Sequence, residues 1–139
     1  MVWHHEHRVK DGVLRHLVDV KAWKEFDEKY PHFAPDPRNV RLGHARDEFN
    51  PFRVMCSTHS TWPVLLIPYN LLLWLSMKQP SIILSMIIPS ERAPDMDIDV
   101  HLQPLIKELL QLWKWVDAFN AYTMTHYKLQ GALHSTTND

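Results

Sequence analysis

Histidine and cysteine are the side chains of this sequence that most readily bind a transition metal. His4, His5 and His7 lie close together near the start, and Cys56 and His59 form a C-x-x-H pair. Structural zinc sites usually take four such ligands in paired spacings. The chain contains one cysteine, which cannot supply a typical zinc finger or an internal disulfide and fits a reducing compartment. We therefore interpret these histidines as scattered polar residues.

Four arginines are gathered in one stretch of the sequence: Arg38, Arg41, Arg46 and Arg53. Such side chains can bind the phosphates of DNA. The neighbouring Asp47 and Glu48 offset part of their charge, and the whole chain has a net charge of −1 with neutral histidines. Composition alone therefore does not indicate a nucleic-acid-binding protein. A solvated surface of mixed charge is favoured, and contact with phosphates is the alternative.

The length and composition are those of one globular domain, because 45% of the 139 residues are hydrophobic and 22% are charged. The most apolar region, Pro63 to Pro89, is divided by prolines and polar residues into pieces of about a dozen residues or fewer. A helix that spans a membrane needs about 20. We predict two buried strands in this region and no contact with a membrane. The polar N-terminus also predicts no secretory signal.

Apolar residues at spacings of three and four predict two helices. The first covers residues 18–30, begins at a cap formed by Asp19 and ends before Pro31. The second covers residues 101–116, which places Pro104 in its first turn, where proline is tolerated. Its apolar stripe comprises Leu102, Leu105, Ile106, Leu109, Leu112, Trp113 and Val116. A polar arm precedes the first helix.

Apolar runs and residues at period two predict four strands, over residues 40–47, 62–69, 81–88 and 127–137. Short links between the first three strands indicate an antiparallel meander. The helix before the fourth strand indicates a right-handed crossover to a parallel position. The expected result is a mixed sheet with helices packed on it. The predicted core comprises Trp62, Val64, Leu66, Ile83, Met86, Leu105, Leu109 and Trp113.

Seven short segments, in order along nearly the whole chain, carry a resemblance to a known family. They are residues 3–8, 22–27, 36–43, 49–52, 61–64, 68–71 and 97–106. Together they resemble the transposases of the CACTA (En/Spm) elements of plants. One such segment would be weak evidence for the family, whereas seven in the right order are specific evidence for it. The chain departs from the family at turns, where Glu48, Leu72, Leu73 and Ser90 replace glycine or proline.

The resemblance implies an RNase H-like core, which opens with three antiparallel strands, a helix and a fourth strand parallel to the first. This is the order that the residues themselves predict. We therefore expect residues 1–39 to form a polar arm with one amphipathic helix. Residues 40–139 are expected to form an incomplete α/β core of the RNase H-like type. The resemblance also implies a nuclear protein whose partner is DNA.

Two acids take their expected role from the same resemblance. Transposases of this broad type cut and join DNA with two metal ions, Mg²⁺ or Mn²⁺, held by three carboxylates. Asp47 follows the first predicted strand and Asp139 follows the fourth, so both are candidate catalytic residues and metal ligands. The third acid would lie beyond residue 139. The chain alone is therefore expected to be inactive, with Asp47 as a strand-end turn acid and Asp139 as a frayed terminus.

Other interpretations stay open beside an inactive transposase fragment. The chain could be a retained module that binds DNA or a full-length transposase through its N-terminal arm and arginines. It could also be a poorly folded product. The predicted last strand has no charge or proline between Leu129 and Thr137, so it lacks the usual protection of an exposed sheet edge. Self-association is expected from that edge.

Overall fold

The computed structural model describes residues 2–7, 9, 11, 13–14, 16–46, 60–90 and 98–138. Within these ranges the elements are α1 (Trp3–Glu6), the 3₁₀ turn η1 (Leu17–Asp19), α2 (Lys21–Lys29), β1 (Val40–Arg46), β2 (Ser60–Pro68), α3 (Leu73–Ser76), the 3₁₀ turn η2 (Gln79–Ser81), β3 (Ile83–Ser90), α4 (Ile98–Lys114), β4 (Val116–Asn120), β5 (Thr125–Leu129) and β6 (Gly131–Asn138). None of the described helices is long and apolar enough to cross a membrane.

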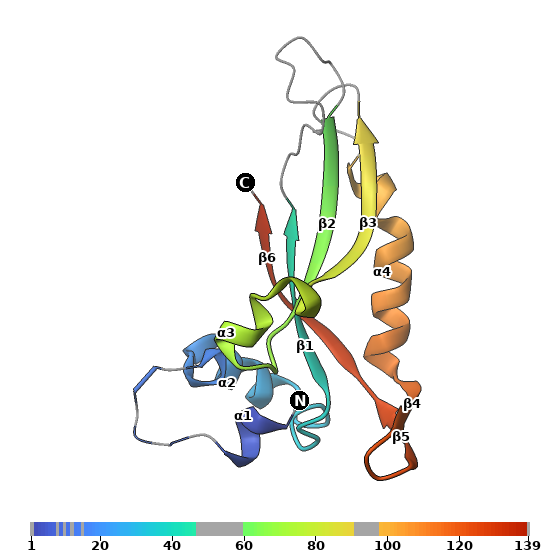
Figure 1. Ribbon diagram of the computed structural model, residues 1–139. Coiled ribbons are helices and arrows are strands. Elements are labelled where there is room, and N and C mark those ends of the chain that lie inside the picture. The colour runs from blue at the N-terminus through green and yellow to red at the C-terminus, as the bar shows by residue number, and fades with distance from the viewer. Residues whose placement is uncertain are drawn as a thin grey trace.

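The main sheet has four strands in the order β3-β2-β1-β6 (Figure 1). β1, β2 and β3 pair antiparallel, and β6 returns beside β1 in the parallel direction. The long helix α4 lies between β3 and β6 in the chain and packs on the sheet. The sequence-based prediction of a mixed sheet with three antiparallel strands, a helix and a parallel strand is therefore confirmed.

The end of the chain is divided differently from the prediction. The expected strand over residues 127–137 is two strands, β5 and β6, which Gln130 separates. β5 pairs with β4 in a second, two-stranded sheet. The hairpin turn is closed by Asn120, whose Oδ1 accepts hydrogen bonds from the backbone N–H groups of Tyr122 and Thr123 at 3.0 and 3.3 Å. Such Asx turns replace the glycine that hairpins often use.

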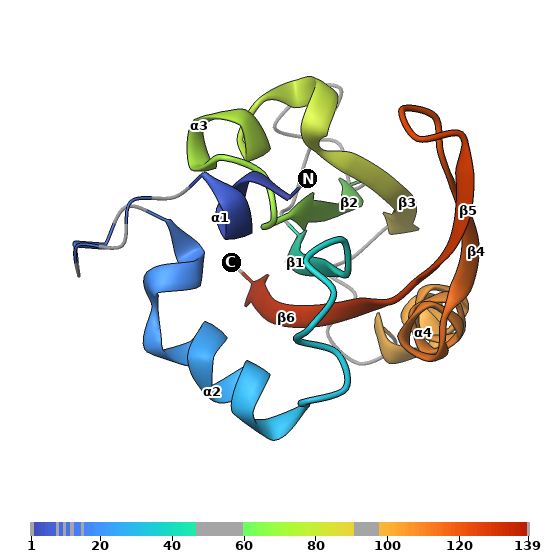
Figure 2. The same cartoon turned by 90° about the horizontal axis from the view of Figure 1, so that it is seen from below.

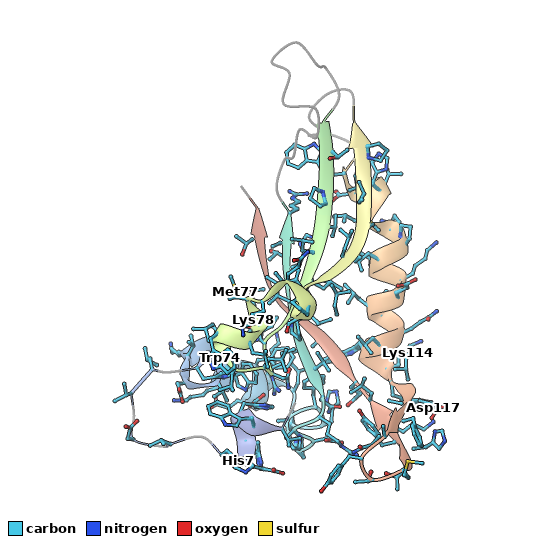
Figure 3. All side chains as sticks on the ribbon, viewed as in Figure 1. His7, Trp74, Met77, Lys78, Lys114 and Asp117 are labelled. Carbon is cyan, nitrogen blue, oxygen red and sulfur yellow. The ribbon has the colours of Figure 1, made fainter. Side chains whose placement is uncertain are left out.

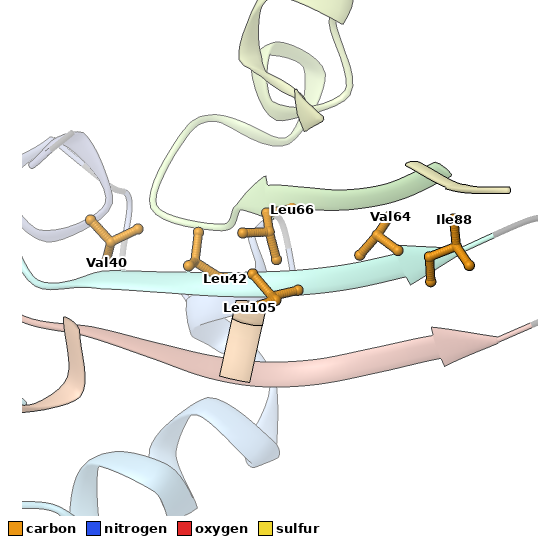
Figure 4. Close-up of a cluster of buried hydrophobic side chains, with 6 residues drawn as sticks. All are labelled: Val40, Leu42, Val64, Leu66, Ile88 and Leu105. Atoms are coloured by element: carbon orange, nitrogen blue, oxygen red, sulfur yellow. The ribbon is translucent and has the colours of Figure 1, made fainter. Parts of the chain in front are cut away.

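A buried apolar cluster joins α4 to one face of the main sheet. It consists of Val40, Leu42, Val64, Leu66, Ile88 and Leu105 (Figure 4). The predicted core residues Trp62, Met86 and Leu109 pack against it and are partly buried. The prediction for Ile83 is wrong, because this side chain is 50% exposed. β3 is an edge strand, and a bulge between the pairs Val64–Met86 and Leu65–Leu84 leaves Ser85 without a partner in the ladder.

The other helices lie on the opposite side of β6 from α4. Figure 2 looks along the strands and shows α2 on one side of β6 and α4 on the other. Trp23 of α2 is 2% exposed and Phe33, which follows the helix, is fully buried. The sheet is therefore covered on both faces near β1 and β6, which is where the candidate functional residues lie.

Two predicted helix starts need correction. α2 begins at Lys21 with no side-chain cap, and the Asp19 carboxylate instead accepts a hydrogen bond from the backbone N–H of His16 at 3.1 Å, which closes η1. α4 begins at Ile98, so Pro104 lies inside the helix and not in its first turn. Proline at that position removes one helical hydrogen bond, which packing of the apolar stripe must offset.

Candidate functional site

The carboxyl ends of β1 and β6 lie side by side. The two parallel strands pair from Val40 with Gly131 through Arg46 with Asn138. Strands of an α/β sheet that run in the same direction bring their carboxyl ends to one edge, where ligands of such sheets usually bind. In the sequence, Asp47 directly follows Arg46 and Asp139 directly follows Asn138. Both acids lie outside the described residues.

A bulge in β6 sets the register of these last pairs. Leu42 pairs with Leu133, but the next residue of β1, Gly43, pairs with Ser135. His134 is therefore an extra residue on β6, and every pair beyond it is offset by one. Without the bulge, Arg46 would face Thr137 and not Asn138. No pattern of charge or proline in the sequence marks His134 as a bulge.

The bulged His134 packs into the aromatic layer between α2 and the sheet. Its ring lies 5.8 Å from that of Trp23 and 5.4 Å from that of Phe26, measured between centroids. Beside it, the Tyr69 hydroxyl and Ser135 Oγ form a hydrogen bond of 2.8 Å over Gly43. A Cβ on Gly43 would stand 2.1 Å from the Tyr69 oxygen. Glycine at residue 43 is therefore required for Tyr69 to reach β6.

Arg41 is buried beneath α2 and does not line the surface. The residue is 2% exposed, and its guanidinium carbon lies 4.2 Å from the centroid of the Trp23 ring. The guanidinium forms an ion pair and a hydrogen bond with the Asp27 carboxylate. Burial lowers the pKa of Arg41, and the charge of Asp27 opposes that shift. In this position the side chain connects β1 to α2 and cannot reach a phosphate at the surface.

The other arginines of the sequence cluster are placed separately. Arg38 binds the Asp36 carboxylate through Nε at 2.9 Å and through a terminal nitrogen at 2.7 Å. This hydrogen bond lowers the pKa of Asp36, while the Arg38 guanidinium also lies 4.2 Å from the Tyr127 ring centroid. Arg46 is half-buried at the carboxyl end of β1, and Arg53 lies outside the described residues. The structure thus separates Arg38, Arg41 and Arg46.

The described residues hold no group of three or more histidines, cysteines, aspartates or glutamates that could bind a metal ion. His4 is buried, with its ring 5.6 Å from that of Trp23, whereas His5 and His7 are exposed. Cys56 and His59 lie outside the described part of the chain. For the oxygen-preferring ions Mg²⁺ and Mn²⁺, the candidate donors are the two acids that follow β1 and β6.

Two buried asparagines fix the start of the pairing between β1 and β6. From the sequence alone they were not selected as functional residues. Asn70 Oδ1 accepts the backbone N–H of Arg41 at 2.7 Å, and its Nδ2 donates to the carbonyl of Asn39 at 2.8 Å. Asn39 in turn accepts the backbone N–H of Gln130 at 3.0 Å and donates to the Phe33 carbonyl at 2.8 Å. β1, β2 and β6 are joined at one point. Both asparagines stand in segments that carry the family resemblance, which was the available signal.

Buried His44 and half-buried His134 predict an acid-sensitive fold. Burial, followed by the charge of Arg46, lowers the pKa of His44, and burial, followed by Arg41, lowers that of His134. Among the described residues, both ring nitrogens of His44 and the Nδ1 of His134 are buried without a hydrogen-bond partner. The unfolded chain therefore binds protons more readily, so stability is present above the unfolded pKa of about 6.5 and is lost as pH falls below it.

The free energy of urea unfolding, measured between about pH 7 and pH 5, tests this acid sensitivity. Each such histidine lowers that free energy by at most about 1.4 kcal/mol per pH unit. We expect the free energy to fall with pH, and His134→Gln to make the fall less steep. The same change at exposed His101 is the control. A free energy that rises on acidification would contradict this prediction.

The match to a known family covers the elements described above. The model of transposase family tnp2 matches residues 11–139, a range that includes β1, β6, α2 and both acids. No match was found among curated proteins or among solved structures. Since the matched range is nearly the whole sequence, the chain belongs to the transposase family tnp2.

Proposed function

We propose that this chain is part of the catalytic core of a plant DNA transposase of the CACTA (En/Spm) type, with an RNase H-like fold, and that it acts in the nucleus. In this proposal Asp47 and Asp139 supply two of the carboxylates that hold Mg²⁺ or Mn²⁺. The observation that carries it is the pairing of Arg46 with Asn138, the residues directly before the two acids. Membership of a transposase family supports the reaction class, the cutting and joining of DNA.

The register supports the pairing of the two acids. Neighbouring strands of a sheet lie about 4.8 Å apart, so Asp47 and Asp139 continue from backbones that are already adjacent. Carboxylate oxygens are the ligands that hard divalent cations prefer. Bound ions of this kind stabilise the negative charge that develops at a phosphate during strand transfer. The same reaction class needs a third carboxylate, so we propose that these 139 residues alone do not cut DNA.

Binding of Mn²⁺ tests the two acids without relying on activity. We expect weak binding, followed by electron paramagnetic resonance of the free ion, that decreases at least about tenfold in Asp47→Asn and in Asp139→Asn. Asp117→Asn is the matched control, because this exposed carboxylate lies on the β4–β5 hairpin, far from the carboxyl ends of β1 and β6 (Figure 3). Binding that neither variant changes would refute the metal site. If the unmodified chain nicked DNA in a metal-dependent way and Asp47→Asn did not, only the proposed inactivity would be refuted.

DNA binding without catalysis is the second candidate function, and the position of Arg46 favours it. This residue lies at the carboxyl end of the parallel strands, whereas Arg41 is buried and Arg38 is paired with Asp36. We expect Arg46→Ala to weaken binding to duplex DNA and to reduce the slope of log affinity against log salt by about 1. Fluorescence anisotropy at several salt concentrations measures both. An unchanged slope in Arg46→Ala, with a reduced slope in the control Arg38→Ala, would contradict this placement.

A further inference from the structure

The β6 strand presents an unpaired edge with none of the usual protection. In the described part of the chain β6 pairs with β1 alone and ends the main sheet. Residues 131–138 contain no charged side chain and no proline. Free backbone N–H and C=O groups of such an edge bind another extended strand unless charge, proline or a covering segment prevents it. The occupant that this edge fits is therefore a β-strand.

An apolar groove runs beside the same edge and limits the chemistry of that strand. The groove has a volume of about 300 Å³ and lies between α2 and α4, with the start of β6 as its floor. Its walls include Phe26, Leu110 and Trp113, and no charged side chain lines it. Leu110, Ile106 and Leu133 are 58%, 41% and 40% exposed. In Figure 2, α2 and α4 lie to either side of this edge of β6. The strand that fits carries aliphatic side chains.

The opposite edge of the sheet provides a strand of that kind. β3 ends the sheet on the other side and has no charged residue over Ile83–Ser90. Ile83, Leu84 and Ile87 are 50%, 54% and 56% exposed, an unusual set for one strand of a monomer. The bulge at Ser85 and the missing N–H of Pro89 weaken its far half, so the regular part around Leu84 is the part available for pairing.

We propose that β3 of a second copy docks against β6, with its aliphatic side chains in the groove, so that the main sheet continues from one molecule to the next. A contact between two β6 strands fits less well, because the residues after Leu133 are histidine, serine, threonine and asparagine. Since β3 and β6 are different surfaces, each added copy leaves one of each free. Such a contact does not close on itself and generates open-ended chains.

Two blocked variants test this arrangement. Leu84→Lys places a charge on β3, and Leu133→Lys places one on β6 beside the groove. By sedimentation velocity at micromolar concentration, we expect a concentration-dependent series of oligomers for the unmodified chain and monomers for each variant alone. An equimolar mixture should form a one-to-one dimer and nothing larger, because only one intact β3 and one intact β6 remain between the two. Val100→Lys, at an exposed site on α4 outside the groove, should assemble like the unmodified chain.

Thr136→Lys, at another exposed residue of β6, replaces Leu133→Lys if circular dichroism shows that the latter does not fold. Dimers of Leu84→Lys alone would overturn the proposal in favour of contact between two β6 strands. A mixture that stays monomeric would overturn it as well. So would an unmodified chain that stays monomeric at about 100 µM, within the micromolar-to-millimolar range in which unpaired strand edges associate.

Discussion

Replacing Asp27 with alanine should destabilise the fold by about 3 kcal/mol, because it leaves the buried charge of Arg41 without its partner. The Arg41 side chain is 3% exposed, whereas that of Asp27 is 33% exposed, so the uncompensated charge lies deep between α2 and β1. The Nε of Arg41 already lacks a hydrogen-bond partner among the described residues. The free energy of urea unfolding measures the loss.

A double replacement separates the charge from the packing. Arg41→Met combined with Asp27→Leu keeps the volume beside Trp23 and removes both charges, and such replacements of buried pairs are often neutral or stabilising. We therefore expect the double variant to recover most of the stability lost in Asp27→Ala. Glu25→Ala is the control, because Glu25 forms only an exposed pair with Lys21 on the same helix. Equal losses in Glu25→Ala and Asp27→Ala would show that the buried pair has no special role.

The strand order followed from local patterns, and the details that depend on distant contacts did not. The runs around Val64 and Ile88 predict strands wherever they lie, so β2 and β3 were placed within two residues or so of their observed bounds. The exposure of Ile83 depends on which strand is at the edge and where α4 lies, and no local pattern contains that information. The hairpin β4–β5 was missed because Ala118 and Asn120 give its strands only a weak alternation.

The arginine cluster shows the same limit at the candidate site. Neighbouring residues of a strand point to opposite faces, so the sequence could place Arg41 opposite Leu42. Whether that face meets water or a helix depends on α2, whose Trp23 and Asp27 cover it. The sequence could place Asp47 and Asp139 after two strands, but not the bulge at His134 that sets their offset. The roles of the two acids and the division at residue 39 stay predictions.

The asparagines that join the strands lead to the second large effect. Asn70 is fully buried and satisfies the backbone N–H of Arg41 and the backbone carbonyl of Asn39. Alanine in its place leaves both groups buried without a partner, at about 1–3 kcal/mol each. We expect Asn70→Ala to lower the free energy of unfolding by about 2–6 kcal/mol in total. Asn120→Ala is the control, because Asn120 also forms two hydrogen bonds with backbone groups but does so in an exposed turn.

The loss of Asn70 should extend to the far end of β1, because the same join holds β1 to β6 through Asn39 and Gln130. Register is the property that places Arg46 beside Asn138, so a loosened start of the ladder permits slippage at its end. Amide hydrogen exchange measures this directly: protection of the β1 and β6 amides near Arg46 should fall more in Asn70→Ala than in Asn120→Ala. If Asn70→Ala lost protection only around residue 70, the asparagines would support the turn after β2 and would not set the register on which the proposed pairing of Asp47 with Asp139 depends.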